Sequence, residues 1–236
     1  MRILIFLIFL VSPLTVFAET DLFTCLNNST LKANESKSAL EKTQTAYSVV
    51  NNMTANFAQD SYLSALETAE SSSGKLYFTK PGKMRWEYEN PEEQVFLIVD
   101  TTLWFYQALD KQVVVDKFSK FLISDLPVAF ILGIGDLGKS FEIQKSCVNA
   151  SGKSIYFSLV PKKKSAKSES DDRLNKFELL VNKDTYLPEA AKIYDIASNV
   201  NTFYLKDMEI NKAITEELYV AKFPDGTDID DRRKEN

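Results

Sequence analysis

The segment from Gly74 to Val115 constrains the fold of this 236-residue chain more than any other part of the sequence. Apolar and charged residues alternate within it, as at Met84, Trp86 and Tyr88, which have charged residues between them. This alternation places the apolar side chains on one face of a β-strand. Residue pairs typical of turns, such as Pro81-Gly82, separate the stretches at short intervals. The pattern predicts consecutive antiparallel strands joined by short turns.

The rest of the chain adds strands and two helices. We expect strands over 55–59, 141–148, 155–160, 177–181, 190–196 and 201–210. The first helix is predicted from Ser38, which forms a capping-box pattern with Glu41, to about Val50. The second begins near Asp125, ends at Gly133 and is apolar on all sides. With no linker or internal repeat, the sequence predicts one mainly β (α+β) domain.

The composition argues against several classes of function. The chain has no histidine, which is the commonest general base and the commonest metal ligand. Its seven glycines form no phosphate-binding or dinucleotide motif. With 28 basic and 33 acidic residues, a basic surface that binds nucleic acid is not expected. We therefore predict no metal, no cofactor and no nucleic-acid partner.

One pair of carboxylates offers an enzymatic alternative. Glu87 and Glu89 lie on one face of a predicted strand, about 6.6–7 Å apart along it. That separation is compatible with the two carboxylates of an inverting glycosidase. Their alternation with Trp86 and Tyr88 instead favours the solvated face of a half-buried sheet. We therefore do not predict an enzyme.

The N-terminus has the pattern of a secretory signal. Arg2 precedes an apolar run, and Ala18 provides a small residue before a cleavage site at Glu19. The apolar stretch is shorter than the ~20 residues of a membrane-spanning helix, so an uncleaved anchor is the weaker alternative. We expect a signal peptide at 1–18, a loose polar leader at 19–37 and the folded domain at 38–236.

Two cysteines, Cys25 and Cys147, follow this cleavage site. Exported proteins seldom keep two free thiols, so a disulfide between them is expected, and two unpaired thiols are the alternative.

Aromatic residues make up 12% of the chain, and many lie on predicted strands. A curved antiparallel sheet either fills its interior with such side chains or encloses a cavity for an apolar ligand such as an acyl chain. Periodicity alone leaves both open. The candidate cavity-lining residues are Met84, Trp86, Phe96, Phe105 and Tyr106.

Four segments resemble one protein family. The segment from Gly74 to Trp86 resembles its G-x-L-x-x-x-R-P-x-x-F-x-W motif, and that from Val99 to Tyr106 its D-G-x-x-L-W-x-Y motif. The segment from Leu126 to Gly133 matches its P-x-x-L-L-x-G helix, and that from Phe223 to Asp228 its closing P-P-x-G-x-D. Over residues 38–231 the chain resembles the periplasmic outer-membrane lipoprotein carrier family, LolA.

This resemblance implies an incomplete antiparallel β-barrel, closed by a helical lid over a hydrophobic cavity. Such monomeric chaperones of the periplasm take acylated lipoproteins from an inner-membrane ABC exporter. They hold the acyl chains and deliver them to an outer-membrane receptor, without a cofactor. The alternative is a periplasmic lipid-binding protein, receptor or lipoprotein sensor of the same fold with a different apolar ligand.

The resemblance also assigns roles to single residues. Met84 and Trp86 fall on the family's cavity-lining aromatic pair. From helix placement we expect lid contacts from Tyr47 and Val50 on the first helix, and from Phe130 and Ile131 on the second.

Lys80 stands where the family has an arginine that hydrogen-bonds lid carbonyls and latches the closed form. Lysine has three rotatable donors in place of a planar fork of five. We therefore predict a looser latch.

Overall fold

The computed structural model describes residues 21–118, 137–162 and 174–234. Within them it has one sheet of 13 strands in the order β1-β8-β9-β10-β11-β12-β2-β3-β4-β5-β6-β7-β13. The strands are β1 (Cys25–Thr30), β2 (Asn52–Leu63), β3 (Thr68–Thr79), β4 (Lys83–Asn90), β5 (Gln94–Val99), β6 (Thr102–Gln107), β7 (Gln112–Lys117), β8 (Phe141–Asn149), β9 (Ser154–Pro161), β10 (Leu174–Asn182), β11 (Pro188–Asp195), β12 (Val200–Ile210) and β13 (Asp228–Asp231). The helices are α1 (Ala33–Ser48), α4 (Leu137–Ser140) and the 3-10 turns η1 (Ser64–Leu66), η2 (Glu216–Tyr219) and η3 (Arg232–Lys234).

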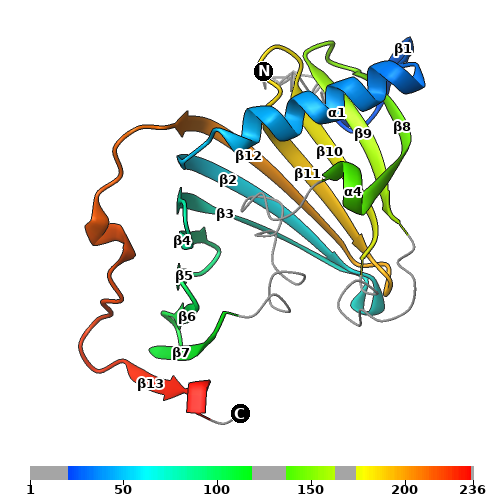
Figure 1. Ribbon diagram of the computed structural model, residues 1–236. Helices are drawn as coiled ribbons and strands as arrows, with labels where there is room; N and C mark the ends of the chain where they lie inside the picture. Colours follow the sequence, from blue (N-terminus) through cyan, green and yellow to red (C-terminus); the bar gives the residue numbers. More distant parts are fainter. Residues whose placement is uncertain (1–20, 119–136, 163–173, 235–236) are drawn as a thin grey trace, which may run out of the picture.

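The sheet is open, because its two edge strands, β1 and β13, do not pair with each other. It curves so that α1 lies across one of its faces (Figure 1). Neighbouring strands are antiparallel except at one edge, where β13 pairs with β7 in parallel. The mainly β fold with an incomplete barrel is thus confirmed.

Long pairings in the middle of the sheet follow from the alternating sequence. β2 and β3 pair over twelve residues, from Asn52↔Thr79 to Leu63↔Thr68. β3 then pairs with β4, with a register shift between Ser73 and Gly74. At Gly74 a Cβ atom would lie 1.8 Å from the carbonyl oxygen of Glu87, so only glycine allows this close approach.

The strand period of two divides the apolar side chains between two faces. We call the face toward α1 the inner face and the opposite one the outer face. On β5, Ile98 belongs to the inner cluster and Phe96 packs against it; the cluster also includes Tyr47 of α1 and Val50, which follows the helix. Val95 and Leu97 belong to an outer cluster.

Two terminal segments cover the outer face. The segment after β12 passes outside β4 to β7 and places Tyr219 in the outer cluster (Figure 1). At the other end, Phe23 packs with Tyr156, Leu180 and Ala190. The sheet is therefore buried on both faces over much of its width.

The predicted loose leader is wrong for the residues that the structure describes. Residues 25–30 form β1, which pairs with β8 through Cys25↔Asn149 and Thr30↔Cys147. A disulfide joins Cys25 to Cys147. An edge strand is held by backbone hydrogen bonds, so a polar sequence does not prevent it from forming.

The first helix begins earlier than predicted, at Ala33 instead of Ser38. The Glu35 carboxylate accepts a hydrogen bond from the Lys32 amide at 2.8 Å, which satisfies a donor at the helix start. Glu41, which was expected in the capping box, lies within the helix, one turn after Lys37. The helix ends at Ser48, so Val50, whose side chain is fully buried, lies in the connection to β2.

The predicted signal peptide and the predicted second helix, with Phe130 and Ile131, lie outside the described residues. Within the described part of the chain, every helix is too short or too polar to cross a membrane.

Candidate ligand-binding interior

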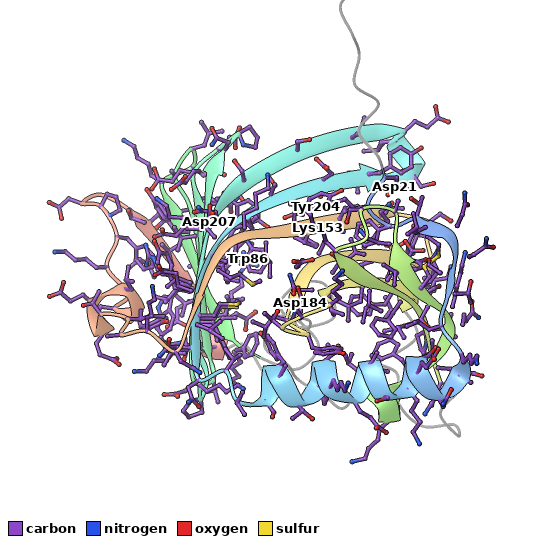
Figure 2. All side chains as sticks on the ribbon, turned by 90° about the horizontal axis from the view of Figure 1, so that it is seen from above. Asp21, Trp86, Lys153, Asp184, Tyr204 and Asp207 are labelled. Carbon is purple, nitrogen blue, oxygen red and sulfur yellow. A yellow bond between two sulfur atoms is a disulfide. The ribbon has the colours of Figure 1, made fainter. Side chains whose placement is uncertain are left out.

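The inner face of β2 to β6 and β12 is lined by aromatic side chains. Trp86 is its centre: its ring lies 4.8 Å from that of Phe57 and 5.9 Å from that of Phe203, between ring centroids. Figure 2 shows Trp86 on the side of its strand that faces the interior of the curved sheet. Phe96 and Phe105 extend this surface as a stacked pair, 4.3 Å apart. The interior is therefore apolar and rich in rings.

The candidate lining residues divide between the two faces. Met84 and Trp86 are fully buried on the inner face, and Phe96 packs against the same cluster. Phe105 joins them through its stack on Phe96. Tyr106 lies on the outer face, where its ring contacts Phe223 at 5.5 Å, so its expected place in the cavity is wrong. Adjacent residues of a strand point to opposite faces, so Phe105 and Tyr106 cannot both line the interior.

The C-terminal end of α1 closes one end of this interior. Tyr47 and Val50 pack there against residues of β2, β11 and β12. A small cavity of about 10 Å³ remains, room for about one water molecule. Its walls are Tyr47, Val50, Met53, Leu187, Pro188, Leu205, Met208 and Ile210. Among the described residues, side chains therefore fill this end of the interior apart from that small cavity.

Lys80, in the turn between β3 and β4, holds the end of α1. Its Nζ donates hydrogen bonds to the carbonyl oxygens of Tyr47 and Ser48, each at 3.3 Å. The same ammonium lies 5.7 Å from the centre of the Tyr47 ring. Partial burial lowers the pKa of Lys80 below its usual value. A cation at the C-terminus of a helix also interacts favourably with the helix dipole.

Asn211, at the end of β12, holds the same segment from the other side. Its Nδ2 donates to the carbonyl oxygen of Val49 at 3.1 Å, and its Oδ1 accepts from the amide of Asn51 at 2.7 Å. Its own φ of 55° lies in the left-handed region, which asparagine tolerates. The sequence pattern predicts no role for Asn211. The hydrogen-bonding groups are 162 and 160 positions away, which local sequence does not reveal.

Two buried polar atoms of the interior have no hydrogen-bond partner among the described residues. They are the Tyr47 hydroxyl and the Trp86 indole nitrogen. Burial raises the pKa of Tyr47, so its hydroxyl stays protonated at neutral pH.

The carboxylates considered for glycosidase chemistry lie away from this interior. Glu87 accepts from the Arg85 Nε at 2.5 Å, and Arg85 also donates to the carbonyl oxygen of Leu218 in the C-terminal segment. Glu89 forms an ion pair with Lys75 at 2.8 Å. Each carboxylate thus has a cationic neighbour.

The fold is shared with solved structures of low sequence identity. An uncharacterized conserved protein from Thermus thermophilus matches with a TM-score of 0.52 and 14% identity, over 84% of this chain and 99% of that one. MucB matches with a TM-score of 0.51 and 12% identity, over 80% of this chain and 64% of MucB.

Sequence comparisons find relatives of higher sequence identity than these structures. An outer-membrane lipoprotein carrier protein of Nitrosomonas europaea is 26% identical over 178 residues, which is 74% of this chain and 80% of the relative. One of Legionella pneumophila (strain Corby) is 26% identical over 195 residues, which is 82% and 90%. The model of the family described as outer membrane lipoprotein carrier protein LolA matches residues 48–222. With this match over most of its length, the chain belongs to the LolA family.

Proposed function

We propose that this protein is a periplasmic carrier that binds the acyl chains of lipoproteins and delivers them from the inner to the outer membrane. The observation that carries the proposal is the apolar interior closed by α1, whose end is held by the side chains of Lys80 and Asn211. The names of the relatives support the same cargo.

The energetics of closure suit a carrier. Each CH₂ group removed from water contributes about 0.8 kcal/mol, so about ten buried CH₂ groups contribute about 8 kcal/mol. A hydrogen bond contributes about 0.5–1.5 kcal/mol, or about 1.5–3 kcal/mol when the donor is charged. The few side-chain bonds that hold α1 are therefore weak enough for a bound acyl chain to displace them. They are strong enough to close the apolar interior when no cargo is present.

The full proposal includes the route of the cargo. An inner-membrane ABC exporter supplies the lipoprotein, and an outer-membrane receptor accepts it. The carrier acts as a monomer, is exported by a cleaved signal peptide, and needs no cofactor. It binds and releases its cargo without making or breaking a covalent bond. Lys80, Tyr47 and Val50 act at the lid, with Phe130 and Ile131 as further lid contacts.

The test is release of a lipoprotein from spheroplasts. Purified mature protein is incubated with Gram-negative spheroplasts that express a tagged outer-membrane lipoprotein, and the supernatant is analysed for an acylated lipoprotein in complex with the carrier. Trp86→Glu places a charge in the interior and is expected to abolish release. Leu109→Glu, at a position 75% exposed, is the matched control and should release normally. No release by the wild-type protein, with an active carrier alongside, would contradict the proposal.

A further inference from the structure

Two hydrogen-bond donors in the interior are buried without a partner in the described residues. Tyr47 is 7% exposed and Trp86 is 1% exposed, and both belong to the inner cluster. Neither the Tyr47 hydroxyl nor the Trp86 Nε1 has a hydrogen-bond partner there. Because roughly 90% or more of buried polar groups in proteins are paired, each such atom requires an explanation.

Three other tyrosines that are buried or partly buried have hydrogen-bond partners for their hydroxyl groups. The Tyr156 hydroxyl donates to Glu178 at 2.8 Å, and the Tyr88 hydroxyl donates to Gln59 at 2.7 Å. The Tyr219 hydroxyl pairs with Thr79 at 2.9 Å. Tyr47 differs from these three in lining the cavity, whose other walls are apolar. Its hydroxyl is buried beside the apolar inner cluster, without a hydrogen-bond partner among the described residues.

The chemistry of the two donors defines the missing partner. An indole N–H can only donate, and the Tyr47 hydroxyl is protonated, so both require an acceptor. The inner cluster consists of hydrophobic residues, and the Lys80 ammonium beside Tyr47 already donates to two backbone carbonyls, which disfavours a buried carboxylate or phosphate there. An uncharged carbonyl oxygen attached to an apolar chain meets both conditions.

We propose that Tyr47 and Trp86 bind the carbonyl oxygens of the ester or amide links that join acyl chains to their head group. The interior thereby distinguishes acyl lipids from alkyl ethers of equal length. This inference rests on the proposed function and specifies its ligand chemistry. Tyr47 also accepts the Lys80 hydrogen bond at its backbone carbonyl, so one residue contacts both ligand and latch.

The test compares two lipids that differ only in the carbonyl groups, dipalmitoylglycerol and its ether counterpart dihexadecylglycerol. Each is titrated against the full-length mature protein in competition with a fluorescent apolar dye. A neutral hydrogen bond corresponds to about a 2- to 12-fold change in affinity, so the wild-type protein should prefer the ester by at least that factor.

Three variants assign the preference to single atoms. Tyr47→Phe removes only the hydroxyl, and should reduce the preference by about 2- to 12-fold while leaving the affinity for the ether unchanged. Replacement of Trp86 by benzothienylalanine, which lacks the N–H at nearly the same shape, should act in the same way. Tyr219→Phe removes a buried hydroxyl of the outer face and should keep the full preference.

The outcomes separate this inference from the proposed function. Equal affinity of the wild-type protein for both lipids, or an unchanged preference in Tyr47→Phe and in the Trp86 replacement, would overturn the role of the carbonyl groups and leave the carrier function intact. Failure of the wild-type protein to bind either lipid would overturn the proposed function and this inference with it.

Discussion

The lysine that holds α1 allows a quantitative test of how the interior opens. Lys80→Met removes the ammonium and keeps a similar apolar stem, so both hydrogen bonds to the carbonyl oxygens of Tyr47 and Ser48 are lost. Hydrogen bonds from a charged donor contribute about 1.5–3 kcal/mol. Because Lys80 is only half-buried, solvent screening reduces this contribution. We expect a net loss of about 1–2 kcal/mol, which changes the ratio of closed to open forms by about 5- to 30-fold.

Hydrogen exchange in the last turn of α1 measures this change directly. Protection of the amides of residues 44–48 should fall by the same factor, while the urea midpoint of the whole protein changes little. Lys83→Met is the matched control, because the Lys83 ammonium pairs with Glu216 and lies over the Tyr219 ring of the outer cluster. Asn211→Gly, which keeps the left-handed backbone, should lower protection in the same turn. Lys80→Arg offers more donors and should raise protection and slow the transfer of cargo.

Unchanged exchange in Lys80→Met would contradict a role of the Lys80 hydrogen bonds in closure. It would mean that apolar packing of Tyr47 and Val50 alone keeps the interior closed.

Three further predictions concern stability. Burial raises the pKa of Tyr47 and Tyr88 above the value near 10 that they have when unfolded, so their contribution to the free energy of unfolding is fully present below about pH 10 and is lost as the pH rises above it. The free energy of unfolding should then fall by about 1.4 kcal/mol per pH unit for each tyrosine, and Tyr47→Phe should reduce this slope by the contribution of one tyrosine. A free energy of unfolding that does not change above pH 10 would contradict this. Reduction of the Cys25–Cys147 disulfide, which links positions 122 residues apart, should lower the free energy of unfolding measured in urea by about 2–5 kcal/mol. It should also remove hydrogen-exchange protection from β1; retained protection would contradict a role of the disulfide in holding that strand. Gly74→Ala brings a methyl group against the Glu87 carbonyl and should cost about 1–3 kcal/mol, whereas Ser73→Ala should cost little; equal midpoints would refute the close approach.

The inner face of the central strands was predictable because its signal is local. Met84, Trp86 and Tyr88 alternate with charged residues, and the period of two alone assigns them to one face. Tyr106 was misplaced because residues 103–106 are apolar at every position, so periodicity cannot separate their faces. The outer face there is covered by the distant Phe223, which the strand sequence does not indicate.

Long-range contacts explain the other differences. The N-terminal segment has a polar composition typical of a loose leader, yet β1 is held by backbone pairing with β8 and by Cys147. The start of α1 depends on Glu35 accepting from Lys32, a side-chain contact that competes with the capping pattern at Ser38. The contribution of Asn211 to closure depends on the fold bringing β12 beside the end of α1.

The most direct test of the central claim, that acyl chains occupy the inner face, uses the neighbouring residues Phe105 and Tyr106. Each is replaced in turn by photoreactive benzoylphenylalanine, and the protein is loaded on spheroplasts and irradiated. The tagged lipoprotein should be crosslinked from position 105, on the inner face, and not from position 106, under the C-terminal segment. Crosslinking from position 106 alone, or equally from both, would contradict it.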